Sequence, residues 1–549
     1  PNVKAILDGG KFLTKQGKLS VLKNLKLPST HFSNVSKDLD GGKETEVEKD
    51  LLSLVLSRYS DLFEAVKKNP SKIEGIVNEI NALKIDNRFI RAEDLEPARV
   101  IIIDDFFSHL SSFEKESLIE QALDTIFSGG FAPHFNFGGA ATRLGLGAMY
   151  FVKIKDVAKA ILGIDKNPQI QAKLEEYFIK KGYSQEDKDN FFKEVERSYY
   201  SLDESIPDPG MGPRQLIIYR TSLERLAEKE GKDLGEAKII VHLNDEILTD
   251  AFKDLKENNF YNFNPEDIYI LSDSVFRGYQ LTGDINNPLK LDKESIPLPP
   301  GHGYALEQFA KGFQLYIIRE NKLTKVKPSL LDVLVKEGTE FIRTQRINDL
   351  TMWTEDVLSL ERLAYFIHAY QEEDSFIGIE LVSNPKGQKG GNFLRLKGTD
   401  RCFLVETLTA KPSWISPILD KAKENLWPYN AFRNFYQVGE LGRILSGYRL
   451  PRYLREKGLR FYIEMVTGDI TQLPTVKVTA FRINKVETIH DFKEFKNLAG
   501  ALEFTGEWEK SLYDGGIKRV RDKFDGGKPE YSEYIRNYRE IAENKGIDS

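Results

Sequence analysis

The chain has 549 residues, 40% of them hydrophobic and 30% charged, and a formal net charge of -6. This length predicts two to four structural units with a core large enough to enclose a site. The composition excludes a wholly disordered, collagenous or disulfide-stapled protein. The weak negative charge provides no overall field that would attract nucleic acid or an anionic membrane, although a local basic site is still allowed.

The cysteine and histidine content also limits the possible chemistry. Cys402 is the single cysteine, which excludes an intrachain disulfide and a site with several thiolate ligands. The seven histidines are scattered, without an HExxH motif or a paired spacing. The first residues, PNVKAILDGGKF, do not resemble a signal peptide, and no apolar run approaches the roughly 18 residues of a membrane span. We therefore expect a cytoplasmic protein with no nucleic-acid and no membrane partner.

The first part of the chain predicts helices followed by one strand. An irregular lead-in is followed from Val47 by apolar residues at helical spacing, with a break at Pro70. The run ARVIIIDDFF then changes the period and predicts a strand over Val100 to Ile103. We expect residues 1–97 to form a helical N-terminal region.

Asp104 and Asp105 follow this predicted strand and have two interpretations. Two carboxylates at a strand end could hold a divalent metal. The alternative, which we favour, is that they lie in the connection to the next helix. Ser111 and Glu114 have the spacing of a capping box for that helix, and Gly129 with Gly130 would close it.

The middle of the chain alternates strand and helix patterns. A charged segment from about Ile170 to Tyr199 predicts a solvated helical insertion. AKIIVHLND predicts a buried strand, an amphipathic helix through Phe252 to Leu255 follows it, and Ile268 to Leu271 predicts another strand. This alternation predicts a wound α/β sheet whose ligand lies beyond the carboxyl ends of its strands. Residues 486–549 predict a helical C-terminal region with glycine-rich turns.

The stretch FNFGGAATRLGLGAMYFVKIK has the parts of a phosphate-binding loop. Gly138 and Gly139 allow backbone amides to approach an anion, Arg143 offers a forked cation, and Lys153 offers a compact one. The stretch matches neither GxxxxGK[ST] nor GxGxxG. A plain turn is the alternative, because glycine pairs often mark turns.

A second glycine element, IPLPPGHGYALEQF, spans Ile296 to Phe309. It places a Gly-His-Gly turn directly before a helical pattern, and such a turn would let a flat ring lie against backbone that carries no side chain. Taken alone, a surface loop with a solvated histidine is the more frequent outcome.

Six segments in order resemble the eukaryotic-type UDP-sugar pyrophosphorylases, the family of UDP-N-acetylglucosamine, UDP-glucose and UDP-sugar pyrophosphorylases. GGAATRLG resembles their GGxGTRLG loop, and PPGHG is similar to the PPGHG of the UDP-glucose branch. The other four segments are GTEFIRTQRINDLTMWTED, GIELVSNPKGQKGGNFLRLKGTDRCFLVE, YNAFRNF and LPTVKV. Together they span roughly residues 130 to 485, about two thirds of the chain.

The resemblance implies both a fold and a reaction. The fold would be a Rossmann-like, GT-A-like nucleotidyltransferase domain over residues 98–485, with a mixed sheet flanked by helices and with helical N- and C-terminal additions. The reaction would be uridylyl transfer, in which UTP and a sugar 1-phosphate give a UDP-sugar and pyrophosphate with Mg²⁺ as cofactor. Both reactants are polyanions, so the site must align them and neutralise their charge.

The resemblance also assigns the nucleotide and metal sites. The triphosphate would lie on Arg143 and Lys153 with Gly138, Gly139 and Thr142. The uracil would face Gly301, His302 and Gly303. Mg²⁺ would be held by Asp349 or Asn348, although Asp349 could equally be a helix N-cap.

The sugar site would be formed by the later segments. Glu406, Asn430 and Asn434 would hydrogen-bond the sugar hydroxyls, with polar residues at a strand edge as the alternative. Lys477 would bind the sugar phosphate, with a solvated lysine beside Pro474 as the alternative.

The sequence departs from the family pattern at several positions. Ala141 replaces a glycine of the loop, and the residue seven positions after Arg143 is Tyr150 where the family has lysine. The usual Asp-Asn order is inverted at Asn348-Asp349. These departures favour a divergent member. They leave open a nucleotide-sugar binding protein without turnover, and, less favoured, a glycosyltransferase that uses Asp104 and Asp105 as its metal pair.

Overall fold

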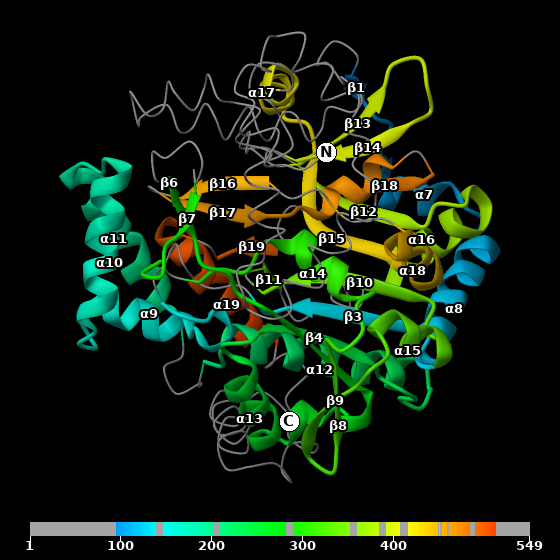
Figure 1. The fold of residues 1–549 in the computed structure, drawn as a ribbon, viewed down its shortest axis with the longest axis horizontal. Helices are drawn as coiled ribbons and strands as arrows, with labels where there is room; N and C mark the ends of the chain where they lie inside the picture. The colour runs from blue at the N-terminus through cyan, green and yellow to red at the C-terminus, as the bar shows by residue number, and fades with distance from the viewer. Residues whose placement is uncertain are drawn as a thin grey trace, which may run out of the picture.

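The computed structural model describes residues 95–138, 146–202, 208–281, 289–295, 297–347, 349–351, 360–383, 391–406, 416–447, 450, 453–457, 460–473, 475–483, 489–492 and 494–511. Its centre is a ten-stranded mixed sheet that crosses the molecule (Figure 1). In order across the sheet, the strands are β2 (Ile101–Ile102), β18 (Val478–Ile483), β12 (Ile377–Val382), β15 (Tyr429–Gln437), β10 (Phe341–Arg346), β3 (Phe131–Asn136), β4 (Ile239–Asn244), β5 (Ile268–Asp273), β8 (Leu315–Arg319) and β9 (Lys322–Lys325).

The strand directions define one functional edge of this sheet. β10, β3, β4 and β5 are parallel neighbours, and β12, β18 and β2 are parallel to one another. β15 is inserted between β10 and β12 and runs antiparallel to both. The seven parallel strands therefore end on the same side, where β15 begins. We call this side the carboxyl edge, and the opposite side the amino edge. The predicted mixed sheet and the buried strands β4 and β5 are confirmed.

Three smaller sheets surround the central one. They are β1 (Leu95–Pro97) with β13 (Asn392–Leu396) and β14 (Cys402–Val405); β16 (Tyr453–Lys457) with β17 (Arg460–Glu464), β6 (Tyr279–Leu281) and β7 (Leu289–Leu291); and β11 (Asp349–Thr351) with β19 (Ile489–Asp491).

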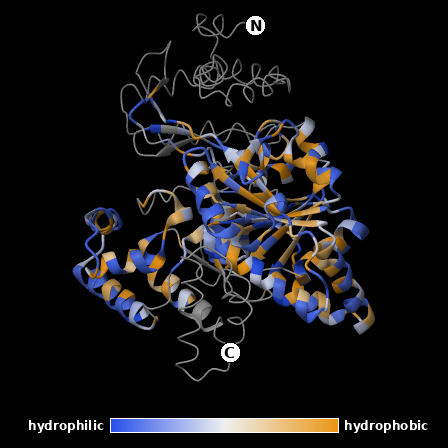
Figure 2. Ribbon diagram, turned by 90° about the horizontal axis from the view of Figure 1, so that it is seen from below, coloured by the Kyte–Doolittle hydropathy of each residue, from blue (hydrophilic) through white to orange (hydrophobic). Residues whose placement is uncertain are grey.

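Helices cover both faces of the central sheet. The face of Phe341, Phe435 and Phe481 packs against α8, α12 and α16. The face of Ile342, Tyr436 and Ala480 packs against α14, α15 and α18. Figure 2 shows hydrophobic residues concentrated along the strands between these layers. The described helices are α7 (Ile103–His109), α8 (Ser112–Phe127), α9 (Ile154–Ile161), α10 (Pro168–Lys181), α11 (Gln185–Tyr200), α12 (Met211–Lys229), α13 (Leu248–Glu257), α14 (His302–Gln308), α15 (Leu330–Lys336), α16 (Leu360–Glu373), α17 (Ser416–Glu424), α18 (Val438–Gly447) and α19 (Leu498–Ser511).

Local sequence signals explain several helix ends. The predicted capping box is present: the Ser111 side chain accepts from the backbone of Glu114, and the Glu114 side chain accepts from the backbone of Ser111. Gly129 follows the end of α8 with φ of 75°, a conformation that favours glycine. The predicted helical insertion forms α10 and α11, which stand at the left of Figure 1.

The predicted strand over Val100 to Ile103 is wrong in its extent. β2 is an edge strand of two residues, and α7 already begins at Ile103. Asp104 and Asp105 therefore lie in the first turn of α7 and not in a connection between elements. Negative charge in the first turn interacts favourably with the helix dipole. Five strand positions of about 4.8 Å separate β2 from β3, which leads into the glycine loop.

The terminal regions join the central fold more closely than the sequence predicts. Residues 95–97 form β1, which pairs with β13. The C-terminal region contributes β19, which pairs with β11, and α19, whose Leu498 and Leu502 belong to the main core. The predicted helices before residue 95 and the segment after residue 511 lie outside the described residues.

Candidate functional site

The glycine loop leaves the sheet at the carboxyl edge. Gly138 lies two residues beyond the end of β3, and its carbonyl accepts a hydrogen bond of 3.1 Å from the Asn244 side chain at the end of β4. Asn244 is buried, and its Oδ1 accepts from the backbone of Glu246 and Ile247. Asn244 therefore fixes the start of the loop, which the sequence alone did not indicate. Gly139, Ala141, Thr142 and Arg143 lie outside the described residues.

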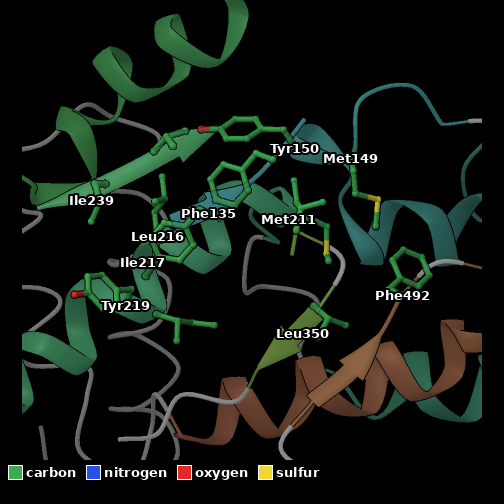
Figure 3. Packing of buried hydrophobic residues seen from close by; sticks show 14 of the residues in the cluster. Phe135, Met149, Tyr150, Met211, Leu216, Ile217, Tyr219, Ile239, Leu350 and Phe492 are labelled. Atoms are coloured by element: carbon green, nitrogen blue, oxygen red, sulfur yellow. The ribbon is translucent and has the colours of Figure 1, made fainter. Parts of the chain in front are cut away.

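Three residues could take the place of the family's loop lysine, and the structure separates them. Tyr150 is fully buried, and its hydroxyl donates to Asp254 over 2.7 Å. Figure 3 shows Tyr150 among hydrophobic side chains near Phe135 and Met211. Lys155 is also buried, in α9. Lys153 is the exposed one of the three, at the N-cap position of α9, as a phosphate contact would require.

The Gly-His-Gly turn has a structural reason for its glycines. Gly301 has φ of 91°, and an added Cβ would lie 2.5 Å from the Met465 carbonyl oxygen. A Cβ on Gly303 would lie 2.6 Å from the backbone nitrogen of Val466. Gly303 donates its backbone N–H to the Met465 carbonyl over 3.0 Å. The turn therefore packs on the chain that follows β17, and its contact with uracil stays a prediction.

His302 is the first residue of α14, so the predicted helix begins within the Gly-His-Gly turn and not after it. Its Nδ1 accepts a 3.0 Å hydrogen bond from the Thr467 backbone N–H. In neutral His302 the proton therefore resides on Nε2, which can act as a donor. The imidazole ring lies 5.1 Å from the ring of Phe432, in an edge contact.

Glu406 and Asn430 are brought together, as predicted, but both are buried. Glu406 is 5% exposed, and its carboxylate accepts a 3.4 Å hydrogen bond from the Asn430 side chain. An added Cβ at Gly391 would lie 2.8 Å from the Glu406 carboxylate, so this glycine makes room for it. Burial raises the pKa of Glu406 to about 7, despite the opposing effects of Asn430 and of the positive charge on Arg346.

Asn434 lies near this pair on β15. The Asn434 side-chain nitrogen donates to the Tyr436 hydroxyl over 3.3 Å. The pKa of Tyr436 is raised mainly by burial, and the negative charge of Glu406 adds to this rise. The Asn434 Oδ1 is buried without a hydrogen-bond partner among the described residues. An unsatisfied amide oxygen in such a place suits a ligand hydroxyl that donates.

Arg346 and Phe432 complete the cluster, and the sequence did not identify either. Arg346 ends β10 opposite Asn136 of β3, and its guanidinium carbon lies 4.5 Å from the centre of the Phe432 ring. Phe432 has φ of 56°, which is uncommon for an aromatic residue, and its backbone N–H donates to Asn430 Oδ1 over 2.8 Å. Both side chains are half-buried. We call His302, Arg346, Glu406, Asn430, Phe432 and Asn434 the edge cluster.

Lys477 is not brought together with the edge cluster. It precedes β18, whose first residue pairs with Ile377 at the amino edge of the sheet. From there to the carboxyl edge is on the order of 20 Å along the strands. The Lys477 ammonium pairs with Asp374 at 2.9 Å, and its side chain is 61% exposed. Lys477 is therefore a solvated surface lysine, which was the alternative interpretation of its motif.

The predicted metal residues lie just beyond β10. Asn348 is outside the described residues, and Asp349 begins β11 instead of capping a helix. Asp349 stands opposite Asp491 in the register of β11 and β19. Within the described residues, no group of three or more histidine, cysteine, aspartate or glutamate side chains is arranged to hold a metal. Mg²⁺ commonly uses one or two carboxylates together with substrate phosphates, so an aspartate in this place fits it.

The sheet order and the placement of the edge cluster define an α/β fold with a polar site at the carboxyl edge of its central sheet. No protein-family model matches the chain, and a search of curated proteins finds no relative. No helix among the described residues is long and apolar enough to cross a membrane.

Solved structures identify the fold more closely. A candidate UDP-N-acetylglucosamine pyrophosphorylase of Entamoeba histolytica matches with a TM-score of 0.50 and 13% identity, over 81% of this chain and 96% of the other. The uridine diphosphate N-acetylglucosamine pyrophosphorylase of Trypanosoma brucei, solved with an inhibitor, matches with a TM-score of 0.50 and 14% identity, over 96% of this chain and 91% of the other. The chain therefore has the fold of the UDP-sugar pyrophosphorylases, as the sequence resemblance predicts.

Proposed function

We propose that the protein is a uridylyltransferase that forms a UDP-sugar and pyrophosphate from UTP and a sugar 1-phosphate. The observation that carries the proposal is the meeting of Gly138, His302, Glu406 and Asn430 at one edge of the sheet. These residues come from segments far apart in the sequence that resemble the family in the same order. The shared fold supports the same conclusion.

The chemistry is an in-line displacement at phosphorus. A phosphate oxygen of the sugar 1-phosphate forms a bond to the α-phosphorus of UTP, and the bond from that phosphorus to the bridging oxygen breaks. The electron pair leaves with pyrophosphate, so no covalent enzyme intermediate is needed. The protein contributes alignment and charge neutralisation.

The edge cluster and the glycine loop would divide these tasks. The loop at Gly138, with Gly139, Thr142 and Arg143, would hold the triphosphate, and exposed Lys153 would add a second cation. The Gly-His-Gly turn would place His302 near the uracil. Glu406, once ionised, would accept a hydrogen bond from a sugar hydroxyl, and the side chains of Asn430 and Asn434 would add further polar contacts.

Mg²⁺ would be held by Asp349 together with oxygens of the bound nucleotide. Asp491 stands opposite Asp349 in the register of β11 and β19. The bound ion would neutralise phosphate charge and fix the triphosphate geometry.

The test is an assay of pyrophosphate release. The full chain is incubated with UTP, Mg²⁺ and a panel of sugar 1-phosphates, and we expect release with at least one sugar. Lack of release with every sugar, together with thermal stabilisation by a UDP-sugar, would identify a binding protein instead. Sugar transfer from a UDP-sugar without any dependence on pyrophosphate would identify a glycosyltransferase.

The glycosyltransferase alternative has less support in the fold. Its metal pair would be Asp104 and Asp105, which lie in α7 behind the edge strand β2. By strand spacing this is about 24 Å across the sheet from β3 and the glycine loop. The site at the carboxyl edge is the better support for uridylyl transfer.

A further inference from the structure

The sugar 1-phosphate brings a charged phosphate to the edge cluster, and that charge needs a cationic partner. The predicted partner, Lys477, is at the amino edge and pairs with Asp374 in solvent. The β10 register places Arg346 at the other edge, five residue steps of about 3.3 Å further along the strands. Lys477 and Arg346 therefore cannot serve the same ligand phosphate in this arrangement.

Arg346 has the position that the phosphate requires. It pairs with Asn136 in the register of β10 and β3, two residues before Gly138, so it stands beside the start of the glycine loop. The backbone of Ile347 continues this pairing by donating to the Asn136 carbonyl over 3.2 Å. A phosphate on Arg346 would therefore be next to the triphosphate, as in-line attack demands.

Phe432 gives Arg346 a defined orientation. The guanidinium lies over the face of the Phe432 ring at 4.5 Å, where a cation interacts favourably with the aromatic ring. A guanidinium in a defined orientation can donate two parallel hydrogen bonds to phosphate oxygens. The ring is in turn bordered by His302 at 5.1 Å.

The backbone at Phe432 is held in an unfavourable conformation. Its φ of 56° falls where β15 shifts register against β12, between the partners of Ile379 and Leu381. The hydrogen bond from the Phe432 N–H to Asn430 Oδ1 stabilises this turn, and Asn430 also contacts Glu406. Strained residues of this kind concentrate at functional sites. Asn430 thus contacts both Phe432, on which the Arg346 guanidinium lies, and the Glu406 carboxylate.

We propose that Arg346, oriented by Phe432, binds the phosphate of the sugar 1-phosphate in the place that the family resemblance gives to Lys477. The inference rests on the proposed function, because it names a residue of the same site. It assigns Phe432 as a positioning residue and leaves Lys477 without a role in substrate binding.

The experiment compares Arg346→Ala, Arg346→Lys, Phe432→Leu and Lys477→Ala in the full chain. We expect Arg346→Ala to raise the KM for the sugar 1-phosphate about 10- to 100-fold, with the KM for UTP within about twofold, since a charged hydrogen bond is removed. Arg346→Lys should restore part of the loss, because the charge remains without the planar fork. Phe432→Leu should give a smaller rise, and Lys477→Ala should equal the wild type.

Two kinetic outcomes would overturn the inference. One is an equal rise in both KM values for Arg346→Ala, which would place Arg346 on the triphosphate. The other is a rise in the sugar-phosphate KM for Lys477→Ala with an unchanged value for Arg346→Ala. Unchanged melting temperatures of the variants would confirm that the effects do not come from unfolding.

Calorimetric titration with glucose 1-phosphate and N-acetylglucosamine 1-phosphate separates this inference from the proposed function. If the wild type binds a probe but releases no pyrophosphate, the proposed function fails and the inference is still tested. Loss of that binding in Arg346→Ala then supports the inference, and retained binding overturns it. A wild type that neither binds nor converts any sugar 1-phosphate contradicts both.

Discussion

Two glutamates are buried, one on β12 of the central sheet and one directly after β14, and their pKa values shift in opposite directions. Glu380 on β12 is surrounded by Arg343, Arg362 and Arg433, with closest nitrogen to oxygen distances of 3.5, 3.5 and 3.6 Å. Burial would raise the pKa of Glu380, but the attraction of the three guanidinium groups outweighs it and lowers that pKa. Burial raises the pKa of Glu406 to about 7, although the Asn430 amide and the positive charge of Arg346 oppose this shift.

This difference distinguishes Glu380, a carboxylate that stabilises the fold, from Glu406, a carboxylate that we assign to ligand binding. Glu380 joins three strands and α16 through groups that are all present in the protein itself. For Glu406, the effect of burial on the pKa outweighs the opposing effects of Asn430 and Arg346, as expected of a group whose ionised form gains a further partner from a ligand. The comparison leads to four predictions, from the largest expected effect to the smallest.

The largest effect is expected from Glu380→Gln, which keeps the shape but removes the negative charge. Three buried guanidinium groups would lose the carboxylate that they share, and burial already lowers the pKa of Arg343 to about 9. Breaking a buried ion cluster of this kind costs about 3 to 5 kcal/mol. Urea unfolding should show a lower midpoint with an unchanged m-value.

The matched control for this variant is Glu440→Gln on α18. Glu440 pairs with Arg443 over 2.7 Å at the surface, with side-chain exposures of 33% and 58%. A surface pair contributes at most about 1 kcal/mol. Equal losses in the two variants would contradict the special role of the buried cluster.

Glu406→Gln is expected to stabilise the protein at alkaline pH. The folded pKa of Glu406 is raised from 4.5 to about 7, so the folded state binds more protons than the unfolded state between these values. Wild-type stability therefore falls as pH rises through this window, by about 3 kcal/mol in total. The variant lacks this loss. Urea unfolding at pH 8 and pH 5 would measure it, and a variant less stable than wild type at pH 8 would refute the raised pKa.

The pH dependence of substrate binding should also report the titration of Glu406. A sugar hydroxyl that donates to Glu406 requires the ionised carboxylate, so the wild-type KM for the sugar 1-phosphate should fall about tenfold between pH 6 and pH 8. The phosphate of the substrate also titrates near pH 6. In Glu406→Gln, the pH dependence of the KM would come from this phosphate alone. A wild-type profile that parallels the variant would show that Glu406 does not bind the sugar.

The smallest effect is expected from Lys477→Ala at the amino edge. Lys477 and Asp374 are 61% and 84% exposed, so their attraction is screened by solvent. We expect the free energy of unfolding to change by less than about 0.5 kcal/mol. A decrease of more than about 2 kcal/mol in the free energy of unfolding would show that this exposed pair stabilises the fold much as the buried Glu380 cluster does.

The sequence predicted those parts of the fold that depend on local patterns. Short-range signals predict the capping box at Ser111, the strands β4 and β5 and the helix that follows from Gly301, and all are present, although that helix already begins within the Gly-His-Gly turn. The extent of β2 was missed because a carboxylate pair can begin a helix as readily as follow a strand. The family resemblance assigned Glu406 and Asn430 to the same sugar site, and their side chains are hydrogen-bonded to each other.

The missing parts of the site depend on long-range pairing. Arg346 and Phe432 meet because β15 runs antiparallel between β10 and β12, and no local pattern predicts that insertion. One sequence signal was available for the buried cluster: Glu380 interrupts β12, which is otherwise largely apolar, and buried charges require partners. The position of Lys477 at the amino edge likewise follows from the register of β18 and not from its motif.

The central claim is that this site exchanges uridylyl groups, and the reverse reaction tests it most directly. Labelled pyrophosphate is added to the full chain with Mg²⁺ and a panel of UDP-sugars, and label is measured in UTP. We predict label in UTP with at least one UDP-sugar, and a much lower rate in Arg346→Ala. Absence of label with every UDP-sugar, while calorimetry shows that one of them binds, would contradict the claim.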